Sequence, residues 1–428
     1  MTPQDPRHRR RRSARGWLRA LGPGFITGAS DDDPSGIGTY AQTGAQFGYT
    51  QLWTALFTLP FMIAVQEMCG RIGLVTGKGL AGVIRKYYSK RILWVALTLL
   101  LVANTINIGA DLGAMAASLQ LIIGLPFPVL ILAMTILTLV LEVFVSYKTY
   151  ANVLKYFALT LLAYVLTGLL TRQDWSMVLL HTFIPHFSFN REQIQNIVAL
   201  LGTTISPYLF FWQAGEEVEE EVAEGRLRVM GRGKPRFGVG DIRTMQNDTV
   251  AGMVFSNLIT FFIIVTAAST LYRSGVTQID TAAQAAEALR PLAGNATSVL
   301  FALGVIGTGL LAVPVLAGSA SYALSEALGW RREGLYRTFA QAHGFYGIIT
   351  IATLAGLAIN FTNVPPFRFL YDTAMLNGIV APPLIILILL IARNRRIMGQ
   401  YVNSRLSTVL GIAIAAIMVL CAVLMFVL

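Results

Sequence analysis

The chain has 428 residues, of which 55% are hydrophobic and only 13% are charged. Soluble domains carry about a quarter charged residues, so this composition excludes a water-soluble globular protein. The 33 Lys and Arg residues exceed the 22 Asp and Glu residues, but in a membrane protein such an excess sets topology rather than nucleic-acid binding. Cys69 and Cys421 both lie in or beside apolar stretches, so neither a disulfide framework nor a cysteine-rich metal cluster is expected.

Apolar stretches recur along the whole chain, and about 20 apolar residues are enough for a helix to cross a membrane. They predict an all-α polytopic membrane protein with an odd number of spans and hence with its two ends on opposite sides. The eleven expected spans are 17–45, 50–70, 92–122, 126–146, 150–171, 193–215, 246–271, 296–323, 342–362, 368–392 and 406–428.

The distribution of basic residues predicts the orientation. With a cytoplasmic N-terminus, 28 of the 33 Lys and Arg residues fall on the cytoplasmic side, counting Lys155 just inside the fifth span. Such asymmetry in loops of a plasma-membrane protein marks the cytoplasmic face. We therefore expect a cytoplasmic N-terminus and an extracellular C-terminus. The expected organisation is a basic cytoplasmic tail (1–16), a five-helix repeat (17–171), an extracellular loop (172–192), a second repeat (193–392) with a charged cytoplasmic loop (216–245), and a last loop and helix (393–428).

Two spans are interrupted near their middle. The first reads Ser30-Asp-Asp-Asp-Pro-Ser-Gly36, which combines a proline with three carboxylates at a depth where charge is costly. The sixth reads Gly202-Thr-Thr-Ile-Ser-Pro207, and its proline comes 173 residues after Pro34. Unwound backbone at this depth is tolerated only where it lines a cavity or is buried in protein. Two groups of five spans, each opening with a broken helix, predict an inverted-repeat secondary transporter with an eleventh helix outside the repeat.

Several motifs resemble, in order, those of the Nramp divalent-metal transporters, whose hallmark in the first span is Asp-Pro-Gly-Asn. This resemblance implies the LeuT-type fold, with five plus five helices, helices 1 and 6 unwound, and a metal site between the two breaks. The matching segments are Gly22-Pro-Gly-Phe25, Asp33-Pro-Ser-Gly36, Gly44-Ala-Gln-Phe-Gly-Tyr-Thr-Gln-Leu-Trp53, Arg71-Ile-Gly-Leu-Val-Thr-Gly77, Ala110-Asp-Leu112, Leu300-Phe-Ala-Leu-Gly304 and Arg395-Arg-Ile-Met-Gly399.

The resemblance also implies which residues form the site. Asp33 keeps the family's Asp, whereas Gly36 stands for its Asn, Ser206 for its Met and Tyr208 for its His. A backbone carbonyl ligand of the family falls on Thr203. The metal site implied in this way consists of Asp33, Ser206, Gly36, Thr203 and Ser30. Residues expected around it or along the pathway are Asp31, Asp32, Tyr208, Asp111 and Asn377, the last more as an interhelical hydrogen bond than as an ion contact.

The substitutions at the site favour a hard ion. A thioether suits transition metals, whereas carboxylate, hydroxyl, carbonyl and water oxygens suit Mg²⁺. Replacing Asn by Gly36 and Met by Ser206 also removes side-chain volume, which leaves space for an ion that sheds water reluctantly. The pattern is similar to the Nramp-related magnesium transporters. It predicts a carrier of Mg²⁺, with Mn²⁺ as a second candidate ion, with the lipid bilayer and the ion as its partners, no cofactor and no obligatory protein partner.

Proton coupling is not expected, because Tyr208 replaces the family's His and Ala114 replaces a Glu near Asp111. Three alternatives stay open. They are a proton-coupled Mn²⁺ or Fe²⁺ symporter, a sodium-coupled carrier of organic solutes, and an intramembrane aspartyl hydrolase that would use Asp33 and Asp111. The segment Glu216–Glu224 is interpreted as a helix extension with a solvated acidic face, or else as a vestibule that attracts divalent cations.

Overall fold

The computed structural model describes residues 22–145, 159–330, 334–362 and 364–428. The predicted tail 1–16 and the first part of the fifth span lie outside these residues. The helices are α2 (Pro23–Asp31), α3 (Pro34–Phe47), α4 (Trp53–Thr76), α5 (Leu80–Tyr87), α6 (Lys90–Gln120), α7 (Phe127–Phe144), η1 (Leu159–Leu161), α9 (Leu162–Leu170), α10 (Trp175–Phe183), α11 (Arg191–Thr204), α12 (Pro207–Ala223), α13 (Val239–Thr270), η2 (Tyr272–Ser274), α14 (Ala282–Ala286), η3 (Glu287–Leu289), α15 (Arg290–Ala293), η4 (Gly294–Ala296), α16 (Thr297–Leu328), η5 (Phe339–Gln341), α17 (His343–Ile359), α18 (Pro366–Ala392), α19 (Arg395–Met398) and α20 (Arg405–Val427).

The predicted all-helical architecture is confirmed. Within the described ranges the only β-type pairing is an isolated bridge between Val229 and Arg232. Eight helical stretches of the described chain are long and apolar enough to cross a membrane, and α17 and the η1–α9 stretch are shorter apolar helices. Together with the broken pair α2–α3, they occupy the places of the predicted spans. The connection between α12 and α13 covers only 224–238, because both helices extend beyond the apolar core that marked them in the sequence.

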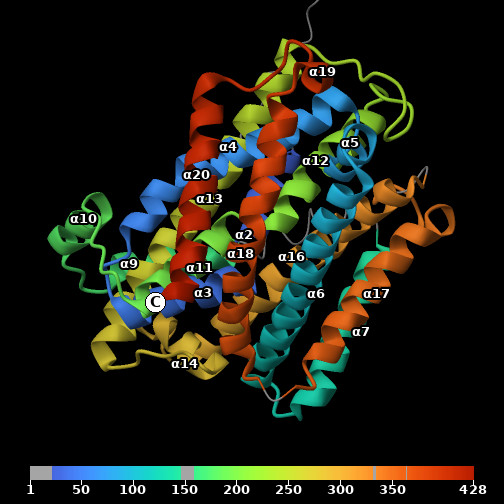
Figure 1. The fold of residues 1–428 in the computed structure, drawn as a ribbon. Helices are drawn as coiled ribbons and strands as arrows, with labels where there is room; N and C mark the ends of the chain where they lie inside the picture. Colours follow the sequence, from blue (N-terminus) through green and yellow to red (C-terminus); the bar gives the residue numbers. More distant parts are fainter. Residues whose placement is uncertain (1–21, 146–158, 331–333, 363) are drawn as a thin grey trace, which may run out of the picture.

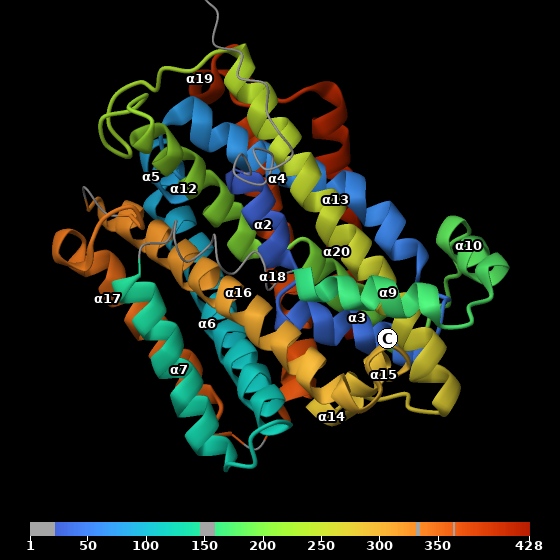
Figure 2. The ribbon, with the colours of Figure 1, turned by 180° about the vertical axis from the view of Figure 1, so that it is seen from behind.

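The long helices form one bundle with two distinct ends (Figure 1). One end, called here the α5 end, carries α5, α19 and the 224–238 connection. The opposite end, called the α14 end, carries α14 and α15, while α10 projects from the side of the bundle (Figures 1 and 2). The helix α20 runs from the α19 region toward the α14 end, where the C-terminus lies. The helices α6, α7 and α17 pack against one another along one side of the bundle.

The two predicted helix breaks have the same local construction. In the first, α2 ends at Asp31 and α3 begins at Pro34, so Asp32 and Asp33 form the break. The second lies between α11 and α12, where Ile205 and Ser206 are non-helical. The backbone is alike at both. The first break residue has ψ 47° in one and 60° in the other, and the second is extended with ψ 172° and 135°. In each case proline follows as the first residue of the next half-helix, where its missing N–H costs nothing.

Glycines let the first half of each broken helix approach a long neighbour. A Cβ on Gly28 of α2 would lie 2.3 Å from the backbone of Gly252 on α13. A Cβ on Gly202 of α11 would lie 2.0 Å from the carbonyl oxygen of Ala374 on α18. Inside a membrane the hydrophobic effect does not drive helices together, so their association depends on close packing. Small residues at the interface allow this close contact.

The carboxylate of Asp248 on α13 holds the N-terminus of α2. Its Oδ2 accepts hydrogen bonds from the N–H groups of Gly24 at 2.7 Å and of Phe25 at 3.2 Å. Its Oδ1 accepts one from the N–H of Gly22 at 3.0 Å. These N–H groups have no partner within a helix, and a negative charge at a helix N-terminus is favourable. The half-helix α2 is therefore bound to α13 at its start as well as along its glycine face.

The prediction of a solvated acidic face on α12 is wrong. Glu216, Glu217 and Glu219 are between 1% and 5% exposed and Glu221 is fully buried. The carboxylate of Glu216 accepts hydrogen bonds from the hydroxyls of Tyr322 and Tyr336, both at 3.3 Å. Hydropathy alone placed these residues in water, whereas the packing of α16 and the 334–338 segment over α12 covers them.

Candidate metal site

The two helix breaks lie next to each other in the middle of the bundle. The first half of each broken helix packs against the second half of the other. Thus α2 contacts α12, and α11 contacts α3. The hydroxyl of Tyr208, in the first turn of α12, donates to the carbonyl oxygen of Ser30 near the end of α2, at 2.8 Å. The breaks therefore bring together half-helix ends of both signs, with carbonyl groups at the ends of α2 and α11 that accept side-chain hydroxyls instead of helical N–H groups. Such an arrangement can hold a cation in a protein interior.

Asp33 is the carboxylate at the centre of this region and is 1% exposed. Its Oδ1 caps α3, since it accepts hydrogen bonds from Ser35 Oγ at 2.6 Å and from the N–H of Gly36 at 2.7 Å. Its Oδ2 has only longer contacts, with Asn107 Nδ2 at 3.2 Å and with the Tyr208 hydroxyl at 3.3 Å. The cap fixes the position of the side chain, and Oδ2 is the oxygen that is left available for a ligand.

Asn107 on α6 connects the buried polar residues, and sequence reasoning did not identify it. Its Nδ2 donates to Asp33 Oδ2 and to Asp111 Oδ2, both at 3.2 Å. Its Oδ1 accepts a hydrogen bond from Asn377 Nδ2 on α18 at 3.0 Å. The interhelical hydrogen bond expected for Asn377 is thereby confirmed. The spacing of Asn104, Asn107 and Asp111 on one face of α6 is the signal from which Asn107 could have been predicted.

Gly36 is closely surrounded by residues of α3 and of α11. Thr203 Oγ1 would lie 3.4 Å from a Cβ on Gly36, and Tyr40 Cε2 would lie 3.2 Å from it. The space beside Gly36 is thus occupied by protein, so the expectation that glycine leaves room there for water is wrong for this position. The hydroxyl of Ser206 donates to the carbonyl oxygens of Gly202 at 2.9 Å and Thr203 at 2.7 Å. None of its hydrogen bonds among the described residues reaches Asp33.

All of the remaining predicted site residues are buried, but they lie on two sides of the first break. Asp111, Asn377 and Tyr208 join the network around Asp33. Asp31 and Asp32 face the other way, toward Ser256 on α13, whose hydroxyl is 2.7 Å from Asp31 Oδ2 and 3.2 Å from Asp32 Oδ1. Within the described ranges, no group of three or more His, Cys, Asp or Glu side chains is placed to hold a metal ion. A cation here would therefore need amide, hydroxyl, carbonyl or water oxygens beside the carboxylates.

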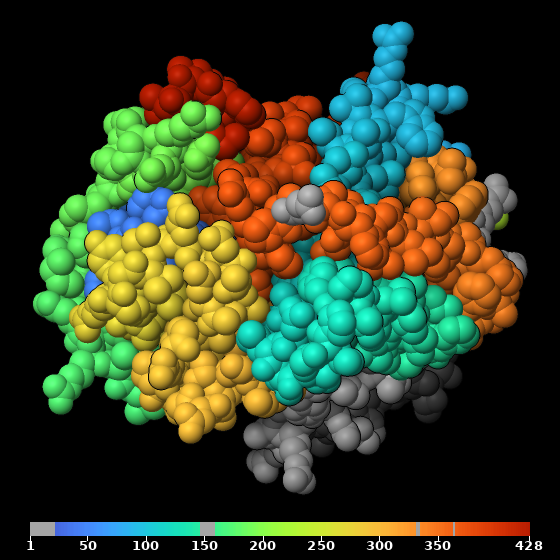
Figure 3. All heavy atoms as spheres, turned by 90° about the horizontal axis from the view of Figure 1, so that it is seen from below, coloured from blue at the N-terminus to red at the C-terminus, as the bar shows by residue number. Residues whose placement is uncertain are grey.

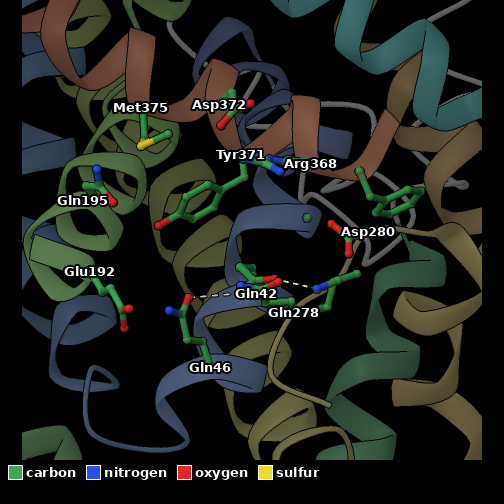
Figure 4. Close-up of a pocket in the computed structure, with 13 residues that line it drawn as sticks. Gln42, Gln46, Glu192, Gln195, Gln278, Asp280, Arg368, Tyr371, Asp372 and Met375 are labelled. Carbon is green, nitrogen blue, oxygen red and sulfur yellow. Dashed lines mark hydrogen bonds between the residues drawn. The ribbon is translucent and has the colours of Figure 1, made fainter. Parts of the chain in front are cut away.

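A cavity of about 350 Å³ lies between α3, the start of α11, the 278–280 segment and α18 (Figure 4). It reaches Gly38 on α3, which is two residues beyond Gly36. The other residues that line it are mostly polar, and three of them, Glu192, Asp280 and Asp372, are acidic. Its opposing walls come from α18 and α3 (Figure 4). The α18 wall contains Arg368, Tyr371 and Met375, and the α3 wall contains Gln42 and Gln46. Figure 3 shows the α14 end of the molecule in full.

Comparison with known proteins places the chain in a family. Residues 24–428 match the model of the family described as Nramp, natural resistance-associated macrophage protein-like. The chain belongs to the Nramp family. A protein of Clostridium acetobutylicum named divalent metal cation transporter MntH is 26% identical, over 96% of this chain and 90% of its own length. The protein of the same name from Bacillus subtilis is 25% identical, over 97% and 93%.

Solved structures show the same fold. The manganese transporter of Eremococcus coleocola in complex with an aromatic bis-isothiourea compound superposes with a TM-score of 0.73 at 17% identity, covering 95% of this chain and 86% of that one. The nucleobase-cation-symport-1 family transporter Mhp1 gives a TM-score of 0.56 at 13% identity, covering 95% and 91%. These likenesses confirm the predicted LeuT-type fold of this Nramp protein. The relatives are membrane transporters, so the chain is not an enzyme and the hydrolase alternative is excluded.

Proposed function

We propose that this Nramp protein is a secondary transporter that lets divalent cations, Mg²⁺ above all, cross the plasma membrane without a coupled proton. Membership of the family and the names of its relatives support divalent-cation transport. The observation that carries the choice of Mg²⁺ is the chemistry around Asp33. Its hydrogen-bond partners are hydroxyl, amide and backbone N–H groups, and Ser206 stands where the family has a thioether. Hard oxygen ligands and one fixed carboxylate suit Mg²⁺, which keeps several of its waters.

In this proposal Asp33 Oδ2 binds the ion, with the carbonyl oxygens of Ser30 and Thr203 and the hydroxyl of Ser206 as further donors. The Ser30 carbonyl oxygen and Asp33 Oδ2 both contact the Tyr208 hydroxyl, so these two oxygens lie close together. Asn107 and Tyr208 orient the carboxylate. Residues that position a ligand in this way usually contribute tenfold to a hundredfold in metal affinity.

Entry takes place through the cavity at the α14 end, which we assign to the extracellular side on the basis of the predicted orientation. Its three carboxylates raise the local cation concentration. Release on the other side requires α2 and α12 to move, because these half-helices pack against each other beside Asp33 and are joined by the hydrogen bond from Tyr208 to Ser30. The membrane potential supplies the driving force, since an inward-moving divalent cation gains about 4.6 kcal/mol per 100 mV.

The absence of a proton partner rests on the residues near the site. By the sequence resemblance, Tyr208 and Ala114 stand where the family has a His and a Glu. The described histidines lie elsewhere, with His181 and His186 hydrogen-bonded to each other near α10 and His343 at the start of α17. A proton relay through a membrane protein needs a series of titratable groups. Asp31, Asp32, Asp33 and Asp111 are buried near the site, so the proposal of uncoupled transport rests on the described histidines lying elsewhere and not on a lack of carboxylates.

The test is ion uptake into proteoliposomes with an imposed potential, negative inside. Mg²⁺ and Mn²⁺ are compared while interior pH is recorded, for the wild type, Asp33→Ala and the exposed-carboxylate control Asp174→Ala. We expect potential-driven Mg²⁺ entry without acidification, lost in Asp33→Ala and kept in Asp174→Ala. Exclusion of Mg²⁺ together with Mn²⁺ entry that acidifies the interior would contradict the proposal and establish an ordinary proton-coupled transition-metal carrier.

A further inference from the structure

The first helix break presents carboxylates on two opposite sides, and the metal site uses only one of them. Asp33 is directed toward α6 and α12, where its partners are Asn107 and Tyr208. Asp31 and Asp32 are directed toward α13, where both contact the hydroxyl of Ser256. The second pair therefore forms a polar cluster of its own between α2 and α13.

No cationic side chain in the described chain is paired with these two carboxylates. Asp31 and Asp32 are both fully buried. The oxygens Asp31 Oδ1 and Asp32 Oδ2 also lack any hydrogen-bond partner among the described residues. The negative end of the α2 dipole lies at the same place, because α2 ends at Asp31. Buried carboxylates without a counter-charge are strongly unfavourable, so this location favours binding of a cation.

Two buried hydroxyls complete the surroundings. Tyr40 on α3 is fully buried and Thr260 on α13 is 1% exposed, and neither hydroxyl makes a well-formed hydrogen bond within the described ranges. The Tyr40 ring lies beside the end of α2, since a Cβ on Gly36 would be 3.2 Å from Tyr40 Cε2 and 3.0 Å from the carbonyl oxygen of Asp31. Thr260 lies one turn beyond Ser256 on the same face of α13. The cluster thus offers oxygen atoms from three helices with unused bonding capacity.

We propose that Asp31, Asp32 and Ser256, with the hydroxyls of Tyr40 and Thr260, form a second cation site that binds a monovalent ion of the sodium type. Asp31 and Asp32 are fully buried and do not line the cavity that reaches α3, so in this proposed site protein oxygens replace the water shell of the ion. Mg²⁺ gives up its waters reluctantly and is the poorer fit. In other transporters, half-helix C-terminal ends coordinate sodium in this way.

The site goes beyond the proposed transport of divalent cations, and its occupation stabilises the docking of α2 on α13. Gly252, whose backbone contacts Gly28, precedes Ser256 by one turn. An ion shared by the end of α2 and by Ser256 therefore links the two helices at a second place, in addition to the glycine contact and the Asp248 carboxylate. Loss of the ion would free the half-helix whose movement the transport cycle requires.

The experiment measures binding of radioactive sodium to the purified full-length protein in detergent at constant pH and ionic strength, with choline as the replacement ion. The wild type should bind sodium saturably. The Asp31→Asn/Asp32→Asn variant should bind it at least tenfold more weakly. Asp33→Asn should keep sodium binding while losing divalent-cation binding, measured in the same samples. Failure of the divalent-cation proposal and failure of the second site are therefore distinguishable.

Milder variants keep the proposal testable if the double variant does not fold, as judged by size-exclusion chromatography and thermal unfolding. Ser256→Ala should weaken sodium binding severalfold. Its control is Ser321→Ala, which removes another buried hydroxyl, one that donates to the carbonyl oxygen of Phe345. Two results would overturn the proposal, namely a folded wild type without saturable sodium binding, and sodium binding that is equal in the wild type and in the folded variants of Asp31, Asp32 and Ser256.

Discussion

At the scale of single residues, the position of Asp33 depends on the hydrogen bonds that surround it. One oxygen is engaged in the cap of α3 and the other faces Asn107 and Tyr208. Because the cap fixes the side chain, an ion can be bound without first ordering a flexible carboxylate. Such pre-organisation reduces the entropic cost of binding.

Asn107→Leu tests the role of the missed residue. The variant removes the donor to Asp33 and Asp111 and leaves two buried carboxylates without it. We expect divalent-cation affinity to fall about tenfold or more, measured by calorimetry on purified protein. The control is Asn104→Leu, one turn earlier, whose amide donates to Leu316 and Ser319 instead. An equal loss of affinity in the two variants would mean that Asn107 acts only through the stability of α6.

At the scale of elements, the half-helices α2 and α11 are fitted to long helices by glycine. Gly28 meets Gly252 of α13, and Gly202 meets Ala374 and Gly378 of α18. The two breaks also share their backbone geometry. The internal symmetry that two prolines indicated in the sequence therefore extends to how each half-helix packs.

Gly28→Ala tests the packing of α2. The added methyl group would lie 2.3 Å from the backbone of Gly252, so α2 and α13 must separate. We expect a lower unfolding temperature and a large loss of ion uptake. Gly347→Ala in α17 is the control, because a Cβ there meets no atom within 4 Å and alanine is the better helix former. Unchanged stability and uptake in Gly28→Ala would show that α2 does not need this contact.

At the scale of the whole molecule, the cavity at the α14 end combines segments from three distant parts of the chain. Its carboxylates come from the start of α11, the connection before α14, and α18 (Figure 4). Charges in a concave surface attract cations from solution, and the attraction weakens as salt screens it.

The double variant Asp280→Asn/Asp372→Asn should therefore raise the apparent KM for divalent cations severalfold at low ionic strength. The effect should be smaller at an ionic strength of about 0.15 M or more, because the Debye length has fallen to about 8 Å there. Uptake kinetics in proteoliposomes measure this. Glu287→Gln is the control, since Glu287 is an exposed carboxylate near the same end that is paired with Arg290 and does not line the cavity. A KM that is unchanged at every ionic strength would remove the cavity from the entry route.

The predicted orientation can be tested with single cysteines, because Cys69 is fully buried and Cys421 is 7% exposed. Ser176→Cys in α10 should react with an impermeant thiol reagent added outside intact cells. Lys234→Cys in the connection between α12 and α13 should react only after the cells are opened. The reverse pattern would show that the basic residues do not mark the cytoplasmic face.

The sequence alone determined the membrane class, the all-α architecture, the two broken helices and the position of Asp33. These features follow from local properties, namely the length of apolar stretches, the chemistry of proline and the cost of charge inside a membrane. Residue types at matching positions along the chain also indicated the family. What depends on chain segments that are close only in space could not be obtained in this way.

Only the tertiary structure decided how the polar residues are shared out. It placed Asn107 beside Asp33, turned Asp31 and Asp32 toward α13, and filled the space next to Gly36 with Tyr40 and Thr203. It also buried the glutamates of α12 that hydropathy assigned to water. Apart from Tyr40, which lies one turn from Gly36 on α3, the deciding contacts join helices that are far apart in sequence, and hydropathy or motif spacing describes one segment at a time.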